Sequence, residues 1–146
     1  MSPTLFRFFI YGVMGWCAEI LWTSLTRRIT GESRNWLLMG ETSLWAFPMY
    51  GSIAFLYEPL HDLLRPQFFL IRAAVYLIGF WVVEYVGGRL IWKITGVMPW
   101  DYSKNPGGSL HGLIRWNFVL IWPLVGLALE PVHDYLVRMT PMLLGE

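Results

Sequence analysis

The chain has 146 residues, of which 55% are hydrophobic and only 14% are charged, and its formal net charge is +1. So apolar a composition lies outside the range of ordinary soluble domains and is typical of a membrane protein. A net charge near zero without a basic run argues against nucleic acid as a partner, and we expect none. Membrane lipid and a small solute or ion are the partners that we expect.

Four apolar stretches follow one another, and each approaches the ~20 residues that a helix needs to cross about 30 Å of hydrocarbon. The first is too long for the core of a signal peptide and has no cleavage site after it, so we interpret it as a retained span. The stretches are Leu5–Leu25, Leu44–Leu64, Ala73–Trp92 and Trp116–Leu136. The sequence therefore predicts an all-α, multi-pass membrane protein with four transmembrane helices in one membrane domain, residues 1–146.

The first pair of stretches recurs in the second pair. Glu19 and its neighbours recur around Glu84 at an offset of 65 residues, and a later motif recurs at an offset of 72. This pattern predicts two tandem repeats of two helices each, about 5–64 and 70–136. Because each repeat contains an even number of spans, the copies should run parallel, related by an axis along the membrane normal.

The parallel repeats predict a topology. Both termini should share one face of the membrane, and the two long loops, Thr26–Ser43 and Lys93–Arg115, should share the other. The long-loop face carries seven Lys and Arg residues against four on the opposite face. This difference favours cytoplasmic long loops.

Glu19 and Glu84 are acids within otherwise apolar spans. An ionisable group in hydrocarbon costs a few kcal/mol, so such residues usually pair, line a cavity or stay protonated. Gly15, Glu19 and Thr23 are spaced four residues apart on one helix face, so the carboxylate should face protein rather than lipid. The two acids are candidates for substrate binding or proton coupling, and the alternative is that they fasten helices together by hydrogen bonds.

The later motif pairs an acid with a histidine in both copies. Glu58 and His61 are spaced i, i+3 and share a helix face, and the same holds for Glu130 and His133. If the second and fourth spans meet, these four side chains could bind a metal ion, which is the cofactor that the pattern suggests. The simpler alternative is a helix kink at the membrane interface with hydrated polar side chains.

The loop between the third and fourth spans is rich in turn-forming residues from Pro99 to Gly108. Asp101 in this loop should cap a turn through its side chain. Alternatively, Asp101 belongs to a lid that guards access to Glu19 and Glu84.

Several short motifs resemble a known family. They are Gly15-Trp16-x-x-Glu19, Trp45-x-x-Pro48-x-Tyr50-Gly51 and Trp100-Asp101-Tyr102-Ser103, together with Glu84 and a late glutamate. The pattern resembles the family called putative ABC-transporter type IV, or CmpB-like permeases, and also the animal transmembrane protein 229 group. The resemblance covers about three quarters of the chain and implies a transport role with glutamates at the positions of Glu19, Glu58, Glu84 and Glu130.

These observations favour transport or permeation of a small solute or ion, with Glu19 and Glu84 at its centre. One alternative is a membrane-embedded metal-dependent enzyme that acts on a lipid-like substrate through Glu58, His61, Glu130 and His133. Another is a structural or regulatory membrane subunit. Four short helices enclose little volume, so we also expect a homodimer.

Overall fold

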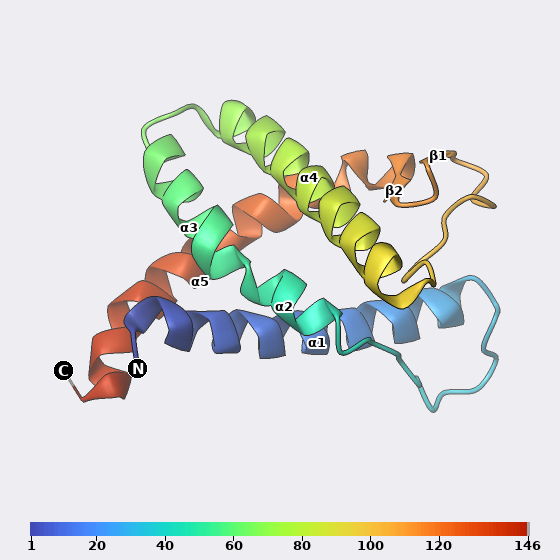
Figure 1. Cartoon of the computed structure of the whole chain (residues 1–146), viewed down its shortest axis with the longest axis horizontal. Coiled ribbons are helices and arrows are strands. Elements are labelled where there is room, and N and C mark those ends of the chain that lie inside the picture. Colours follow the sequence, from blue (N-terminus) through green and yellow to red (C-terminus); the bar gives the residue numbers. More distant parts are fainter. Residues whose placement is uncertain (146) are drawn as a thin grey trace. The chain divides into compact units, whose positions relative to one another are not determined.

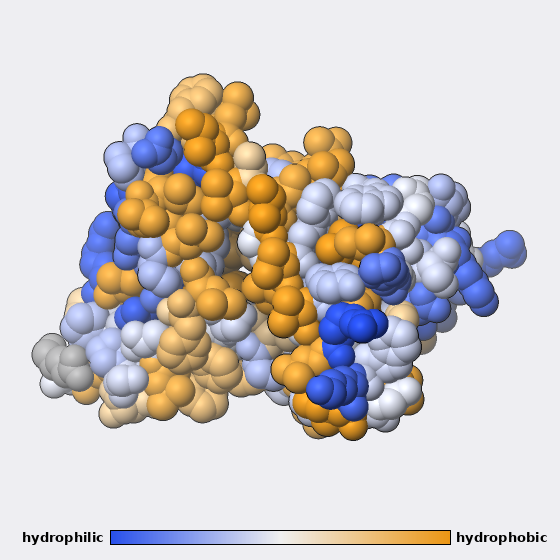
Figure 2. All heavy atoms as spheres, turned by 45° about the horizontal axis from the view of Figure 1, so that its top comes forward, coloured by the Kyte–Doolittle hydropathy of each residue, from blue (hydrophilic) through white to orange (hydrophobic). Residues whose placement is uncertain are grey.

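The computed structural model describes residues 1–145 and is mostly helical (Figure 1). Three segments are long and apolar enough to cross a membrane. They comprise α1 (Pro3–Ile29), α4 (Phe69–Thr95) and α5 (Ile121–Leu144), the last preceded by the 3-10 turn η1 (Trp116–Val119). The first, third and fourth apolar stretches are therefore confirmed as candidate spans. Broad areas of hydrophobic side chains on the surface (Figure 2) are what lipid-facing helices require.

The second apolar stretch is not one long helix, so the candidate membrane-spanning helices among the described residues number three rather than four. Residues 44–64 instead contain α2 (Ala46–Gly51) and α3 (Ile53–Leu64), separated at Ser52. Pro48 lies in α2 and has no N–H to donate, while the hydroxyl of Ser52 donates to the carbonyl of Met49 at 2.6 Å. Neither helix alone has the length of a span.

The chain divides into two compact units, and the first contains Met1–Leu56 with the C-terminal segment from Thr140. Within it, α1 packs against α2. Gly12 and Gly15 face the rings of Phe47 and Tyr50 so closely that a Cβ atom on either glycine would overlap them. The small residues of α1 thus make room for two aromatic rings of α2.

The second unit is Tyr57–Met139 and contains most of α3 and α5, all of α4 and a short hairpin. The hairpin, β1 (Ser109–Leu110) paired antiparallel with β2 (Ile114–Arg115), was not predicted, because two-residue strands leave no alternation in the sequence. On α4, exposed residues recur every four positions, at Ile78, Val82, Val86 and Leu90, whereas Glu84 lies on the buried side. The side chain of Glu84 therefore faces protein.

Candidate functional site

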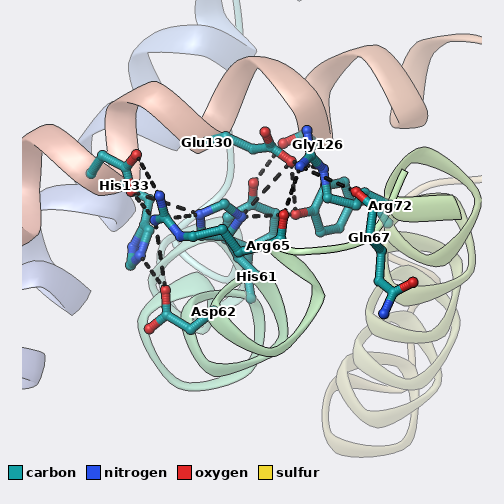
Figure 3. A network of polar contacts seen from close by, with 11 residues as sticks. His61, Asp62, Arg65, Gln67, Arg72, Gly126, Glu130 and His133 are labelled. Carbon is teal, nitrogen blue, oxygen red and sulfur yellow. Dashed lines mark hydrogen bonds and ion pairs between the residues drawn. The ribbon is translucent and has the colours of Figure 1, made fainter. Parts of the chain in front are cut away.

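The two copies of the acid–histidine motif meet inside the second unit (Figure 3). The rings of His61 on α3 and His133 on α5 lie edge to face with centroids 4.8 Å apart, and both side chains are almost fully buried. Contacts between α3 and α5 join residues 69 to 75 positions apart in the chain. Since this difference stays nearly constant, the two helices run in the same direction here.

The contacts of the two histidines are reciprocal. Nδ1 of His61 lies 3.8 Å from the carboxylate of Glu130, and Nδ1 of His133 lies 3.6 Å from that of Glu58. On the other side of each ring, Nε2 of His61 lies 3.7 Å from Asp134, and Nε2 of His133 lies 3.2 Å from Asp62. Each histidine thus has a glutamate of the other motif beside Nδ1 and an aspartate of the other motif beside Nε2.

Arg65 contacts His61, and this contact breaks the symmetry between the surroundings of the two histidines. One of its guanidinium nitrogens donates to Nε2 of His61 at 2.9 Å, and the same group forms a two-pronged ion pair with Asp134. The nitrogen of His61 that accepts this bond carries no proton, so the proton of the neutral ring is on Nδ1. Nδ1 then donates to the hydroxyl of Tyr76 at 2.9 Å.

Tyr76 links His61 to Glu130 through a second hydrogen bond. Its hydroxyl donates to the carboxylate at 3.0 Å, and Arg72 forms an ion pair with the same oxygen atom at 3.0 Å. Glu130 is therefore the hydrogen-bond acceptor of Tyr76 and the ion-pair partner of Arg72, both on α4. A hydrogen-bonded network of this kind holds each member in one orientation.

A hollow of about 320 Å³ opens beside the network. Its lining comprises Asp62, Arg65, His133, Asp134, Val137 and Arg138. The two aspartates beside the Nε2 atoms thus border the hollow, whereas the glutamates beside the Nδ1 atoms do not line it.

The four residues of the predicted metal set, Glu58, His61, Glu130 and His133, therefore lie in one cluster. One group of suitable ligand atoms includes an aspartate instead of the glutamates: one atom each from His61, His133 and Asp134, all within 4.8 Å of one another. Metal binding itself stays a prediction.

Glu84 occupies a different part of the second unit. Its side chain is only 9% exposed, and the polar contact that the structure gives it is the indole N–H of Trp122, at 3.3 Å. One turn further along α4, the side chain of Leu113 and the ring of Trp100 pack so closely on Gly88 that a Cβ atom there would touch them. The hairpin turn and its flanking loop thus cover α4 next to Glu84.

Glu19, in the first unit, has a more polar setting than Glu84. It is half-buried, and the hydroxyl of Thr42 donates to its carboxylate at 2.7 Å. The two acids lie in different compact units, so their proximity stays a prediction.

Asp101 caps a turn, as the sequence predicted. Its carboxylate accepts the backbone N–H of Ser103 at 2.8 Å. This hydrogen bond holds the pKa of Asp101 below its usual range, because it stabilises the charged carboxylate. The lid function proposed for Asp101 stays a prediction.

Sequence reasoning missed five members of the network: Asp62, Arg65, Arg72, Tyr76 and Asp134. Two signals in the sequence pointed to the aspartates and to Tyr76. An aspartate follows the histidine in both copies of the motif, and Tyr76 repeats Tyr11 at the same offset that relates Glu84 to Glu19. Arg65 and Arg72 were assigned to the link between spans, where they counted only toward topology.

A family model described as "Putative ABC-transporter type IV" matches residues 6–144 of this chain. No solved structure matches the chain.

Proposed function

Because the chain belongs to the family described as putative ABC-transporter type IV, we propose that it transports a small solute or ion across a membrane with proton coupling at Glu84. The observation that carries this proposal is the burial of the Glu84 carboxyl group in a candidate span. Its neutral partner, the indole of Trp122, offers a hydrogen bond but no charge. A carboxylate in that setting lacks the compensation that burial of a charge requires, so exchange of a proton is the chemistry available to it.

The packing beside Glu84 suggests how the site is closed. Leu113 is fully buried at the turn of the hairpin, and the indole of Trp100 donates to its carbonyl at 2.9 Å. This contact ties the loop to the hairpin. We propose that the loop and hairpin form a gate that opens to admit solute and otherwise keeps water away from Glu84.

Glu19 is the proposed second coupling residue. Its hydrogen bond from the hydroxyl of Thr42 can be made to a charged or a neutral carboxyl group. Glu19 can therefore change protonation without losing its partner, whereas charging Glu84 is expected to be costlier.

The test is proton flux into liposomes that contain the purified protein and an internal pH dye. A membrane potential set with valinomycin and potassium drives protons inward, and a sodium gradient serves as the solute probe. Glu84→Gln keeps the shape of the side chain but cannot titrate. We expect it to abolish protein-dependent flux, and Glu19→Gln to reduce it severalfold.

Glu32→Gln is the matched control, since Glu32 is exposed in the loop after α1 and should leave the flux unchanged. Each variant must insert and elute as the unmodified protein does. If Glu84→Gln conducts normally but unfolds at lower temperature, the acid fastens helices and the proposed mechanism is wrong.

Topology supplies a separate prediction. We propose that α2 and α3 together act as a broken fourth crossing, since their 19 positions, Ala46 to Leu64, would extend about 28 Å at 1.5 Å per residue. The parallel course of α3 and α5 supports this proposal, because tandem parallel repeats require it. Both termini should then lie on the same side, and the long loops in the cytoplasm.

Cysteine labelling checks the topology. In a Cys17→Ser background, Ser2→Cys and Leu144→Cys should react with a membrane-impermeant maleimide from the same side of oriented vesicles. Asn35→Cys, in the first long loop, should react from the other side. Labelling of the two terminal positions from opposite sides would mean that α2 and α3 do not cross.

A further inference from the structure

We propose that the paired histidine motifs form a binding site for a divalent transition metal ion of the Zn²⁺ class, and that Arg65 occupies this site when the metal is absent. The ligands are Nε2 of His61, Nε2 of His133 and a carboxylate oxygen of Asp134, with Asp62 as the fourth. The proposal goes beyond the transport function and does not depend on it.

The donor set suits this class of ion. Imidazole nitrogen and carboxylate oxygen are ordinary zinc ligands, at bond lengths of about 2.0–2.2 Å in a tetrahedral arrangement. In such a site, neighbouring ligand atoms lie about 3.3 Å apart, by simple geometry from those lengths. The corresponding separations are 3.2 Å between His133 and Asp62 and 3.7 Å between His61 and Asp134. These two pairs are within a few tenths of an ångström of that spacing, whereas the group of His61, His133 and Asp134 spans up to 4.8 Å and would have to contract around an entering ion.

The opposite side of each imidazole ring has the support that metal-binding histidines usually have. Such a histidine donates its second ring N–H to a carboxylate or another acceptor, which fixes its orientation. Nδ1 of His61 donates to Tyr76, which in turn donates to Glu130. Nδ1 of His133 is buried without a hydrogen-bond partner among the described residues, and Glu58 lies 3.6 Å from it. A small movement toward Glu58 on metal binding would satisfy this nitrogen.

Arg65 lies where the ion would bind. Its guanidinium group contacts Nε2 of His61 and the carboxylate of Asp134, and lies 3.9 Å from Asp62. The positive charge of Arg65 lies among three of the four proposed ligands and stabilises their carboxylates, as the charge of a metal ion would. The side chain of Arg65 is 51% exposed, and it borders the hollow beside the cluster. Rotation of Arg65 into this hollow would free the three ligands for an entering ion.

The experiment is isothermal titration of the full-length protein in detergent with Zn²⁺ alone, after treatment with chelator and its removal. We expect one Zn²⁺ ion per chain. His61→Ala and His133→Ala should each weaken binding more than about a hundredfold. Tyr76→Phe, which removes only the hydroxyl group that accepts from His61, should weaken binding about 10- to 100-fold, as the loss of outer-shell partners usually does.

The third histidine of the chain provides the matched control. His111 lies in the hairpin turn, where Nδ1 is 3.0 Å from the hydroxyl of Tyr85, and it is outside the cluster. His111→Ala should bind Zn²⁺ as the unmodified protein does. An equal loss of binding in His111→Ala would mean that surface histidines collect the metal, and would overturn the proposal.

Arg65→Gln keeps the test decisive even if the alanine variants fail to fold. Removing the competing cation should raise Zn²⁺ affinity about tenfold or more, an effect that a merely structural role of the cluster would not produce. Absence of Zn²⁺ binding in both the unmodified protein and Arg65→Gln would overturn the proposal. Because no flux is measured, this result is independent of the outcome for Glu84.

Discussion

Replacing Gly126 with Ala is expected to lower the free energy of unfolding by about 2–3 kcal/mol, an unusually large effect for a single methyl group. Gly126 lies in α5, where an added Cβ atom would be 2.5 Å from Cβ of Tyr76 on α4. A Cβ atom moves only with its backbone, so the helices would have to separate. The carbonyl of Gly126 also accepts a hydrogen bond at 2.6 Å from the buried hydroxyl of Tyr57, which such a separation would weaken.

Gly79→Ala is the matched control for Gly126→Ala. Gly79 lies within α4, and an added Cβ atom would meet only a methyl group of Leu60 at 4.0 Å, an ordinary contact. Alanine favours the helix over glycine by up to about 1 kcal/mol, so this variant should be equally or more stable. Equilibrium unfolding in mixed micelles of mild detergent and SDS measures both. Equal changes in the two variants would contradict the close packing of α5 on Tyr76.

Hydropathy predicted the three long helices because each depends on one property, an apolar run of sufficient length. The observed helices extend beyond the predicted stretches: α4 begins at Phe69 rather than Ala73, and α5 continues to Leu144 rather than Leu136. The same criterion failed for residues 44–64. That stretch is apolar enough, but hydropathy does not record local backbone geometry, here the break at Ser52 between α2 and α3.

The candidate site was predictable only in part. The repeated spacing of Glu58 with His61 and of Glu130 with His133 correctly indicated which residues belong together on each helix. Sequence spacing within one helix cannot show which of its side chains contact the side chains of a second helix. Asp134 is adjacent to His133 in sequence, and side chains at adjacent positions of a helix point in different directions. In the structure Asp134 lies near His61 of the other motif instead. Such a pairing depends on how two helices pack, which a single sequence does not contain.

Glu130→Ala is expected to lower the free energy of unfolding by about 3 kcal/mol, because it leaves Arg72 without its ion-pair partner and Tyr76 without its hydrogen-bond acceptor. Arg72 and Glu130 are only 20% and 17% exposed, with 3.0 Å between their charged atoms. Removing one member of a largely buried ion pair leaves the other charge uncompensated, which typically costs about 3–5 kcal/mol. We expect the lower end, since neither side chain is fully buried. The hydroxyl of Tyr76 would lose its acceptor as well.

A double-mutant cycle separates this electrostatic effect from lost packing. Glu130→Met and Arg72→Met should each be strongly destabilising, whereas the double variant should recover much of the loss, because an apolar pair of similar volume leaves no buried charge. Arg27→Gln is the control at an exposed ion pair, that of Arg27 with Glu41, and should change stability little. All measurements are made with chelator present, so that bound metal does not contribute. If the effects of the two single substitutions add in the double variant, Arg72 and Glu130 are not coupled, and the network on α4 does not hold the histidine cluster in place.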